Sequence, residues 1–339
     1  MAKTSARSSV QLIEKFQQFE PGLQTVYVGT VLKNALTTNN NQYLNLVYQN
    51  FATEGVKVIK VLKDNYWEVV ARKLKGERVV VHYHWFQYSS HKFLRPVTLN
   101  LFWLAIFRLL GGKLVWTVHN RNPHIRKYTK LNHLLRIIFE KLSYRNHVHC
   151  YCAVEEMSAI LKAKTRKFFV VPHPNYPVQL RSRGKSFAVL KEKYHQMPNM
   201  RELQPKDEVY LMFGQIRQYK GILPIAEIFA SFPERKTKKL IIAGSSKEAT
   251  YVYKLEQLPQ QHTNIILVPH FIPDEDEGYF YGAADKVILN HTEILTSGAA
   301  ILAINYGKKL MVPDICCLSE LEGAQIFANQ EELTRQIFG

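Results

Sequence analysis

Residues 213–221 read FGQIRQYKG and form the most informative pattern in the chain. The apolar run before them predicts a strand that ends at Phe213, and a helical pattern follows the last glycine. Gly214 allows a close backbone approach. Arg217 and Lys220 place two cations beside the start of that helix, where unpaired N–H groups also favour an anion. The loop therefore suits a diphosphate. It lacks the Walker spacing, and an ordinary basic turn is the other interpretation.

A second segment, EILTSGAA at residues 293–300, follows another predicted strand and precedes a helix of small residues. Thr296, Ser297 and Gly298 are suited to capping that helix, whose first N–H groups could hold another part of the same phosphate. Glu293 lies just beyond the strand, at the sheet edge where such folds bind ligands. Its carboxylate could accept from a sugar hydroxyl or an attacking alcohol, and a solvent-facing loop acid is the alternative.

Short β-branched runs alternate with longer helical patterns along the chain, which predicts an α/β protein with parallel sheets. Strands are expected at residues 25–32, 56–61, 78–83, 113–118, 147–154, 167–171, 208–213, 238–243, 264–269, 286–289, 309–312 and 325–327. Helices are expected at residues 42–53, 92–110, 130–144, 221–231, 248–258, 276–283, 297–306 and 331–337. A proline-rich stretch at 172–207 divides the chain. We therefore expect two doubly wound, Rossmann-like domains facing across a cleft, residues 1–178 and 179–339.

The charge of the chain is unevenly distributed. Its 339 residues include 45 Lys and Arg against 28 Asp and Glu, a net charge of +17. Residues 1–180 hold 26 of the basic and 9 of the acidic residues, a balance of +17, whereas residues 181–339 hold 19 of each. The two halves are thus expected to meet different partners. A basic half can attract nucleic acid, an anionic membrane or an acidic substrate, and composition alone does not choose among them.

Membrane and compartment signals are weak. The first ten residues are polar, and no apolar run follows them that could serve as a signal peptide. Four cysteines do not make a disulfide framework, which favours a reducing, cytoplasmic setting. The most apolar stretch, residues 97–110, is shorter than the roughly 20 residues that span a bilayer. It predicts either a crossover helix packed on a sheet or an interfacial helix lying among lipid headgroups.

Several motifs follow one another in the second half: FGQIRQYKG (213–221), LIIAG (240–244), VPHFIP (268–273), YFYGAAD (279–285) and SGAAILAINYGKKLMVP (297–313). Together they resemble the GT-B glycosyltransferase superfamily, with similarity to the family 4 enzymes that build bacterial polysaccharides. In the first half the resemblance rests on WTVHNRNPH (116–124) and VPHPNY (171–176).

The resemblance implies a nucleotide-sugar donor held by the second domain and an acceptor held by the first. By the resemblance, Arg217 and Lys220 match the pair at the donor diphosphate, the backbone groups of Phe271 and Ile272 lie where the nucleobase is held, and Ser297, Gly298 and Ala299 match a phosphate-binding helix start. Gly214 and Thr296, beside these residues, are expected at the donor as well. Two cations and a helix N-terminus can stabilise a departing nucleoside diphosphate, so neither a metal nor another cofactor is expected. Retaining members usually carry two glutamates eight positions apart. Here the pair is Glu293 and Ile301, so retaining and inverting routes both stay open.

His119 follows the predicted strand at 113–118 and matches a family histidine near the reacting sugar. An inverting transfer needs a base within about 2.6–3.2 Å of the acceptor hydroxyl. His119 is expected to be that base, or to donate a hydrogen bond to the donor sugar; a strand-end histidine satisfied by the backbone is the alternative. His84 and Asn120 are expected on the same acceptor side, although His84 could equally end a core strand.

Two other patterns look like metal sites. Residues 274–277 read DEDE, a DxD spacing, but acids at this place are expected to cap the N-terminus of a helix. Residues 147–152 read HVHCYC, but no second ligand pair follows at zinc spacing.

These features predict a metal-independent hexosyltransferase of bacterial surface polysaccharide synthesis. Its acceptor would be a lipid-linked glycan, carried for example on polyprenyl diphosphate. The basic domain would lie on the cytoplasmic face of the cell membrane, gaining about 1 kcal/mol per basic residue near the surface. The alternatives are a nucleic-acid-binding protein, for which no recognised module is visible, and a nucleotide-sugar epimerase on the same fold.

Overall fold

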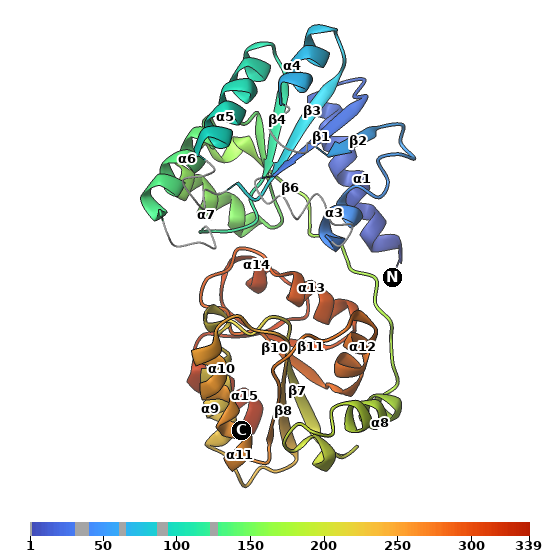
Figure 1. Cartoon of the computed structure of the whole chain (residues 1–339), viewed down its shortest axis with the longest axis vertical. Helices are drawn as coiled ribbons and strands as arrows, with labels where there is room; N and C mark the ends of the chain where they lie inside the picture. Colours follow the sequence, from blue (N-terminus) through green and yellow to red (C-terminus); the bar gives the residue numbers. More distant parts are fainter. Residues whose placement is uncertain (1, 31–40, 61–65, 87–93, 123–127) are drawn as a thin grey trace. The chain divides into compact units, whose positions relative to one another are not determined.

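The computed structural model describes residues 2–30, 41–60, 66–86, 94–122 and 128–339 (Figure 1). The chain divides into two compact units, Met1–Tyr176 and Pro177–Gly339. Their boundary falls two residues before the one expected from sequence, within the same proline-rich stretch.

The first unit is built on a six-stranded parallel sheet with the order β2-β1-β3-β4-β5-β6. Its strands are β1 (Thr25–Thr30), β2 (Lys57–Lys60), β3 (Val79–His84), β4 (Lys113–Thr117), β5 (Arg145–Val148) and β6 (Phe168–Val170). Its helices are α1 (Ala2–Phe19), α3 (Gln42–Val47), α4 (Tyr66–Leu74), α5 (Leu94–Leu109), α6 (Thr129–Leu142) and α7 (Tyr151–Leu161). The strand order reverses between β1 and β3, which is where such sheets bind ligands.

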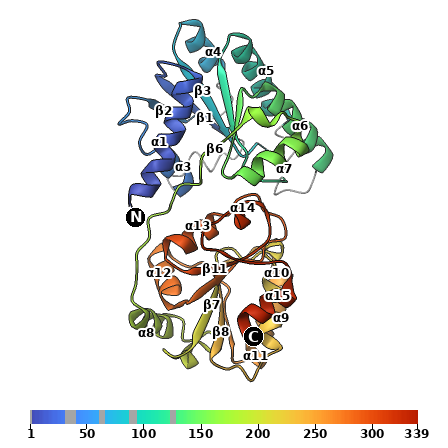
Figure 2. The ribbon, with the colours of Figure 1, turned by 180° about the vertical axis from the view of Figure 1, so that it is seen from behind.

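Side chains on this sheet alternate between its two faces, as the strand period of two requires. Tyr83 points toward Phe139 of α6, with ring centroids 4.8 Å apart, whereas its neighbour His82 contacts Phe16 of α1 at 5.0 Å. In both views, α1 and α3 cover one face and α4, α5 and α6 the other (Figures 1 and 2). The α1–α3 face therefore carries the alternate residues of β3 and β4, and several of these are polar.

The second unit has a six-stranded parallel sheet with the order β12-β11-β10-β7-β8-β9. Its strands are β7 (Glu208–Phe213), β8 (Lys238–Ala243), β9 (Ile265–Val268), β10 (Lys286–Ile288), β11 (Lys309–Pro313) and β12 (Gln325–Phe327). Read from β9, this is the strand order of a dinucleotide-binding domain, which reverses between β7 and β10. The carboxyl ends of those two strands are therefore the expected ligand site.

Helices cover both faces of this second sheet (Figure 2). They are α8 (Arg183–Lys193), α9 (Ile222–Ala230), α10 (Ala249–Glu256), α11 (Leu258–Gln261), α12 (Asp274–Ala283), α13 (Gly298–Asn305), α14 (Cys316–Ser319) and α15 (Gln330–Phe338). One core joins the sheet to α8, α12 and α13, and another joins it to α9 and α15. The doubly wound architecture predicted from the sequence is thus confirmed in each unit.

Several sequence predictions are wrong. The four cysteines were not expected to form disulfides, yet Cys150, Cys152, Cys316 and Cys317 are all disulfide-bonded. Residues 151–154 were expected in a strand but begin helix α7, whose Ala153, Met157 and Leu161 repeat every four residues on its buried side. A short apolar run does not distinguish a strand from a buried helix. Helices α1, α4 and α8 were not predicted, because α1 and α4 contain many polar residues and α8 lies within the proline-rich stretch. The helix expected at 42–53 ends at Val47.

Other predictions hold. The strand expected at 25–32 is present as β1, and its last two positions lie outside the described residues. The acids at 274–277 lie at a helix start, as expected: they form the first turn of α12, after Pro273 at the N-cap. Among the described residues, no helix is both long and apolar enough to cross a bilayer.

Candidate functional site

The loops after β7 and β10 meet at the reversal point of the second sheet. A pocket there is lined by residues from the ends of both strands and from the loop between β7 and α9: Met212, Phe213, Gly214, Lys220, Ile222, Ile288, Leu289, Asn290 and His291. The backbone N–H of Thr292 donates to the carbonyl of Tyr219 at 3.0 Å, and the Asn290 amide donates to the Gly221 carbonyl at 2.9 Å. The tertiary structure therefore joins two segments 70 residues apart into one site.

Two glycines make this close approach possible. Gly221 has φ +58°, and a Cβ there would lie 2.4 Å from the carbonyl oxygen of Asn290. Gly244, after β8, has φ +145°, and its Cβ would lie 2.1 Å from the carbonyl oxygen of Gly214. Side chains at these positions would push the loops apart.

Lys220 lines this pocket, and none of the groups that shift its pKa is an acid. Burial, and then the positive charge of Arg217, lower that pKa to about 8. Arg217 is ion-paired with Glu248 at 3.3 Å, and the same carboxylate accepts from the backbone N–H of Gln218 at 2.8 Å. Lys220 is thus a half-buried cation whose surroundings disfavour its charge, so an arriving anion would stabilise it.

His291 is a pocket residue that the sequence analysis missed. Burial, and then the charge of Lys220, lower its pKa to about 3, so the ring is neutral at pH 7. Its Nδ1 is buried and has no hydrogen-bond partner among the described residues. Buried polar atoms are normally paired, so this one marks a place for a ligand group. Its position, just after a strand next to the reversal point, was the signal that could have identified it.

Helix α13 begins at the far end of the loop that follows β10. Ser297 is its N-cap, and its hydroxyl accepts from the backbone N–H of Ala300 at 3.3 Å, as the sequence predicted. Gly298 and Ala299 open the helix, where N–H groups have no partner within the helix. Thr296 is half-buried beside the cap, and Glu293 is exposed in the loop.

The two residues expected at the nucleobase differ in environment. Phe271 and Ile272 follow β9, and Phe271 is 70% exposed whereas Ile272 is buried in the core beneath α12 and α13. The side chain of Phe271 is therefore also available to stack against a planar ring, whereas the predicted backbone contacts of both residues stay a prediction.

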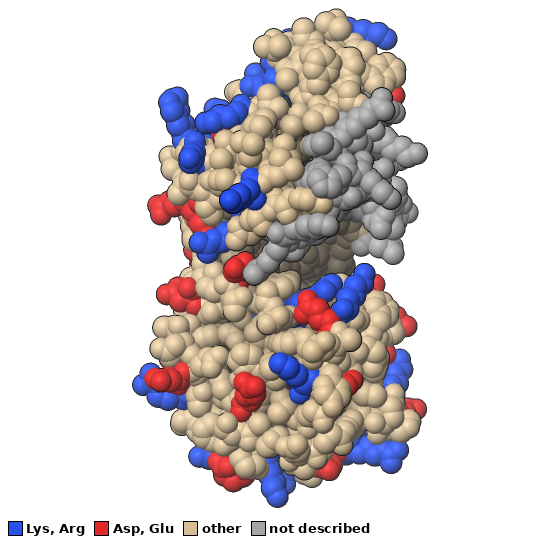
Figure 3. Space-filling model, turned by 60° about the vertical axis from the view of Figure 1, so that its left-hand side comes forward, with Lys and Arg blue, Asp and Glu red and all other residues tan. Residues whose placement is uncertain are grey.

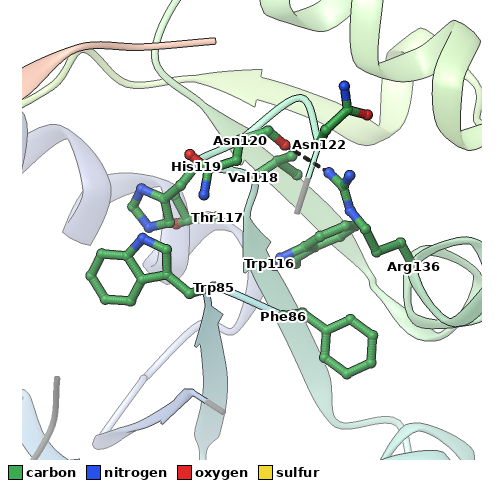
Figure 4. A pocket seen from close by; sticks show the side chains of 9 residues that line it. All are labelled: Trp85, Phe86, Trp116, Thr117, Val118, His119, Asn120, Asn122 and Arg136. Carbon is green, nitrogen blue, oxygen red and sulfur yellow. Dashed lines mark hydrogen bonds between the residues drawn. The ribbon is translucent and has the colours of Figure 1, made fainter. Parts of the chain in front are cut away.

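The first unit has its own pocket at the carboxyl end of its sheet, at the ends of β3 and β4 (Figure 4). It is lined by Trp85, Phe86, Trp116, Thr117, Val118, His119, Asn120, Asn122 and Arg136. Trp85 stacks on the ring of His119, with centroids 4.4 Å apart and planes 14° from parallel. His84 is fully buried, and its Nδ1 lies 2.9 Å from Nε2 of His119. His84, His119 and Asn120, expected on one side of a site, are thus brought together.

Arg136 of α6 is a further pocket residue that sequence reasoning missed. Its guanidinium donates to the carbonyls of Asn120 and Arg121 at 2.8 and 2.6 Å, and lies 5.6 Å from the centre of the Trp116 ring. Burial lowers its pKa to about 10, which leaves it charged at pH 7. A single arginine within a helical pattern gave no signal, because only the fold places it under the loop after β4.

Among the described residues, five histidines besides His119 lie on the same edge of this sheet. They come from the ends of three strands: His82 and His84 from β3, His147 and His149 from β5, and His173 from β6. Burial lowers the pKa of each, to about 4 for His147 and His173 and well below the usual value for the other three. These five rings are therefore neutral at pH 7 and act as hydrogen-bonding groups.

No protein-family model matches the chain, and no curated protein sequence matches it. Solved structures do share its fold. Anabaena Alr3699/HepE in complex with UDP superposes with a TM-score of 0.61 at 11% identity, covering 93% of this chain and 89% of that one. The catalytic domain of Arabidopsis thaliana starch synthase IV, bound to ADP and acarbose, gives 0.64 at 11% identity, covering 93% and 90%. A glycosyltransferase from Rickettsia africae ESF-5 gives 0.61 at 12% identity, covering 93% and 87%. The chain thus has the GT-B fold of two Rossmann-like domains.

Proposed function

We propose that the protein is a glycosyltransferase that moves a hexose from a nucleoside-diphosphate sugar to an acceptor held by the first unit. The observation that carries this proposal is the pocket at the reversal point of the second sheet. There no acid among the described residues shifts the pKa of Lys220, and within the same part of the chain the buried Nδ1 of His291 has no hydrogen-bond partner. The N-terminus of α13 follows in the same loop. Two structures that share the fold, those of HepE and of starch synthase IV, were solved with UDP and with ADP, which supports a nucleotide at this place.

The diphosphate is the group that these residues suit. Lys220 and Arg217 carry positive charge, and a helix N-terminus adds N–H donors and a favourable dipole. Such preorganised charges stabilise a leaving group that becomes more negative as the sugar departs. We propose that they do so without a metal ion, and that Phe271 stacks on the nucleobase. Glu293, exposed at the same loop, is proposed to accept from hydroxyl groups of the donor sugar.

On the acceptor side, we propose His119 as the base that receives the proton of the attacking hydroxyl. His84 and Asn120 would position that base and the acceptor. Because a base at the acceptor is the signature of a direct displacement, this assignment favours inversion at the sugar carbon.

The acceptor is proposed to be a glycan on polyprenyl diphosphate at the cytoplasmic face of the cell membrane. Large apolar side chains are exposed on and beside α5 and α6: Leu99, Phe102, Leu109, Leu110, Leu134 and Ile138. On α6, Lys130 and Lys141 are exposed at either end of the stripe formed by Leu134 and Ile138. Charged side chains visible on the first unit in Figure 3 are mainly Lys and Arg. Apolar side chains framed by lysines suit an anionic lipid surface.

Isothermal calorimetry with UDP, ADP and GDP tests the donor site. Arg217→Ala and Lys220→Ala are each expected to weaken binding by about tenfold or more, since each removes a charged contact. Lys236→Ala, an exposed lysine elsewhere in the same unit, is the matched control and is expected to bind normally. His119→Ala should bind the nucleotide normally but transfer no sugar, and transfer should persist in EDTA. Unchanged affinity in both cation variants would overturn the donor site.

A further inference from the structure

A continuous row of hydrogen bonds runs on the α1–α3 face of the first sheet, from the end of β6 across β5 and β4 to β3, and then back to His119 after β4. Its members are Val171, His147, Thr117, His82, Tyr48, His84 and His119. The successive distances are 2.9 Å from Val171 O to His147 Nε2, 2.9 Å from His147 Nδ1 to Thr117 Oγ1, and 2.6 Å from Thr117 Oγ1 to His82 Nε2. Then follow 2.5 Å from His82 Nδ1 to the Tyr48 hydroxyl, 2.8 Å from that hydroxyl to His84 Nε2, and 2.9 Å from His84 Nδ1 to His119 Nε2.

The direction of the first bond is fixed by chemistry. The Val171 carbonyl can only accept, so the hydrogen of His147 is on Nε2. A neutral imidazole has one N–H, so Nδ1 of His147 is an acceptor and the Thr117 hydroxyl donates to it. A second bond to the same carbonyl, from His149 Nδ1 at 3.0 Å, uses its remaining lone pair and holds this end of the row in place.

Each later bond follows from the one before. The Thr117 hydroxyl donates its only hydrogen to His147, so its oxygen accepts from His82 Nε2. His82 is neutral, so its Nδ1 accepts from the Tyr48 hydroxyl. The Tyr48 oxygen then accepts from His84 Nε2, which leaves His84 Nδ1 as an acceptor. His119 must therefore donate from Nε2. Because burial keeps His82, His84 and His147 neutral, each of these three rings has one donor and one acceptor, and no other direction satisfies all six bonds.

We propose that this row is a device that sets the tautomer of His119, holding its hydrogen on Nε2 and its lone pair on Nδ1. Thr117, Tyr48, His82, His84 and His147 are then positioning residues that act on His119 through the row. The tautomer follows from the hydrogen bonds alone, whereas its use in catalysis rests on the proposed function.

In that reaction, Nδ1 is the atom that takes the proton. The acceptor oxygen bonds to the sugar carbon and loses its proton to Nδ1, while the bond from that carbon to the diphosphate breaks and its electron pair leaves with the nucleoside diphosphate. All acceptor lone pairs in the row point toward His119, so the aligned dipoles favour the positive charge that the ring gains. The far end is a backbone carbonyl, which does not take a proton. The row therefore orients and polarises His119 and does not conduct its proton away.

Ring contacts hold His119 in the plane that the row requires. The Trp85 ring stacks on the His119 ring. The backbone of Trp85 is in the left-handed region, with φ 45°, which a tryptophan adopts only where its surroundings impose it. Tyr43 meets the ring edge-on at 4.9 Å, and its own hydroxyl lies 3.2 Å from Nε2 of His149. His149 donates from Nδ1, so Nε2 accepts and Tyr43 donates.

The test is ¹⁵N NMR of the full chain with labelled histidine at pH 7, with the His119 signals assigned by their loss in His119→Gln. For His119, His84, His82 and His147 we expect the ¹⁵N chemical shift of a protonated nitrogen at Nε2 and that of an unprotonated nitrogen at Nδ1. For His149 we expect the opposite assignment. A His119 ring with its hydrogen on Nδ1 would overturn the proposal whether or not the protein transfers sugar. The expected tautomer in a protein without transferase activity would instead leave the row established and refute the proposed function.

Thr117→Val and Thr117→Ser are the matched pair. Valine cannot relay the hydrogen bond, so both tautomers of His119 should appear and the rate of transfer should fall by about tenfold or more, with nucleotide affinity unchanged. Serine keeps the hydroxyl, so Thr117→Ser should keep the single tautomer of His119, and its rate of transfer should lie within about twofold of the parent rate. If Thr117→Val does not fold, Tyr48→Phe breaks the row by removing one hydroxyl and should mix the tautomers in the same way. A single unchanged tautomer in a folded variant of either kind would overturn the proposal.

Discussion

At the scale of single residues, Lys220 makes donor binding depend on pH. Its pKa is lowered to about 8 by burial and by Arg217, so it is mostly charged at pH 7 and loses its charge as the pH rises through 8. The charged form is the one that attracts a diphosphate. We therefore expect calorimetric affinity for UDP to be about tenfold weaker at pH 9.5 than at pH 7, or about 1.4 kcal/mol.

Lys220→Arg provides the control for this prediction. A guanidinium stays charged throughout this pH range, so the variant should show a nearly flat affinity between pH 7 and pH 9.5. A parent protein whose profile is equally flat would show that Lys220 does not contact the ligand.

The histidines show which features of the first unit could be predicted from single residues and which could not. His119 and His84 were singled out because each lies at the end of a predicted strand, and His147 and His149 were noticed only as a rejected metal pattern. Four neighbouring strands in fact end near a histidine, and carboxyl ends of parallel strands share an edge. That signal was present in the sequence. The order of the hydrogen bonds was not, because it depends on which faces and registers meet.

At the scale of elements, the start of α13 is the feature to test. Ser297→Ala removes the hydroxyl that accepts from Ala300, and is expected to cost about 1 kcal/mol of unfolding free energy, measured by urea denaturation. It should also weaken UDP binding, because the helix start frays where the phosphate is held. Ser297→Thr keeps an accepting hydroxyl and should restore both. Loss of stability with full UDP affinity would separate this cap from the ligand site.

Elements also mark where pattern reasoning fails. The strands of the second sheet were predicted well, because their β-branched runs are buried on both faces and bounded by turns. Residues 151–154 were misassigned because four apolar residues fit either a strand or the start of a helix, and only packing against the rest of the first unit selected α7. Helix α1 was missed although Leu12, Ile13 and Phe16 share one buried side.

At the scale of the whole molecule, the excess of basic residues is confined to the first unit, and we expect it to act together with the exposed side chains of α5 and α6. The protein should float with vesicles containing phosphatidylglycerol but not with pure phosphatidylcholine. Raising the salt from about 0.1 M to about 1 M shortens the Debye length from about 10 Å to about 3 Å and should release most of it.

Phe102→Glu with Leu109→Glu should abolish flotation even at low salt, since both side chains are exposed on α5. Tyr253→Glu is the control, because this residue is equally exposed but belongs to the second unit. If the protein with the α5 substitutions still binds vesicles, the membrane contact lies elsewhere. If binding depends neither on salt nor on lipid charge, the basic residues bind another partner.

The sequence by itself determined the two-domain α/β architecture, the loop that carries Arg217 and Lys220, and the cap at Ser297, because period, glycine placement and capping are local properties of the chain. The tertiary structure alone decided that Lys220 faces His291, that Arg136 lies beneath the loop after β4, and that six of the described histidines share one edge. Those relations join residues tens of positions apart, and they arise only when parallel strands align in register and bury polar groups that must then satisfy one another.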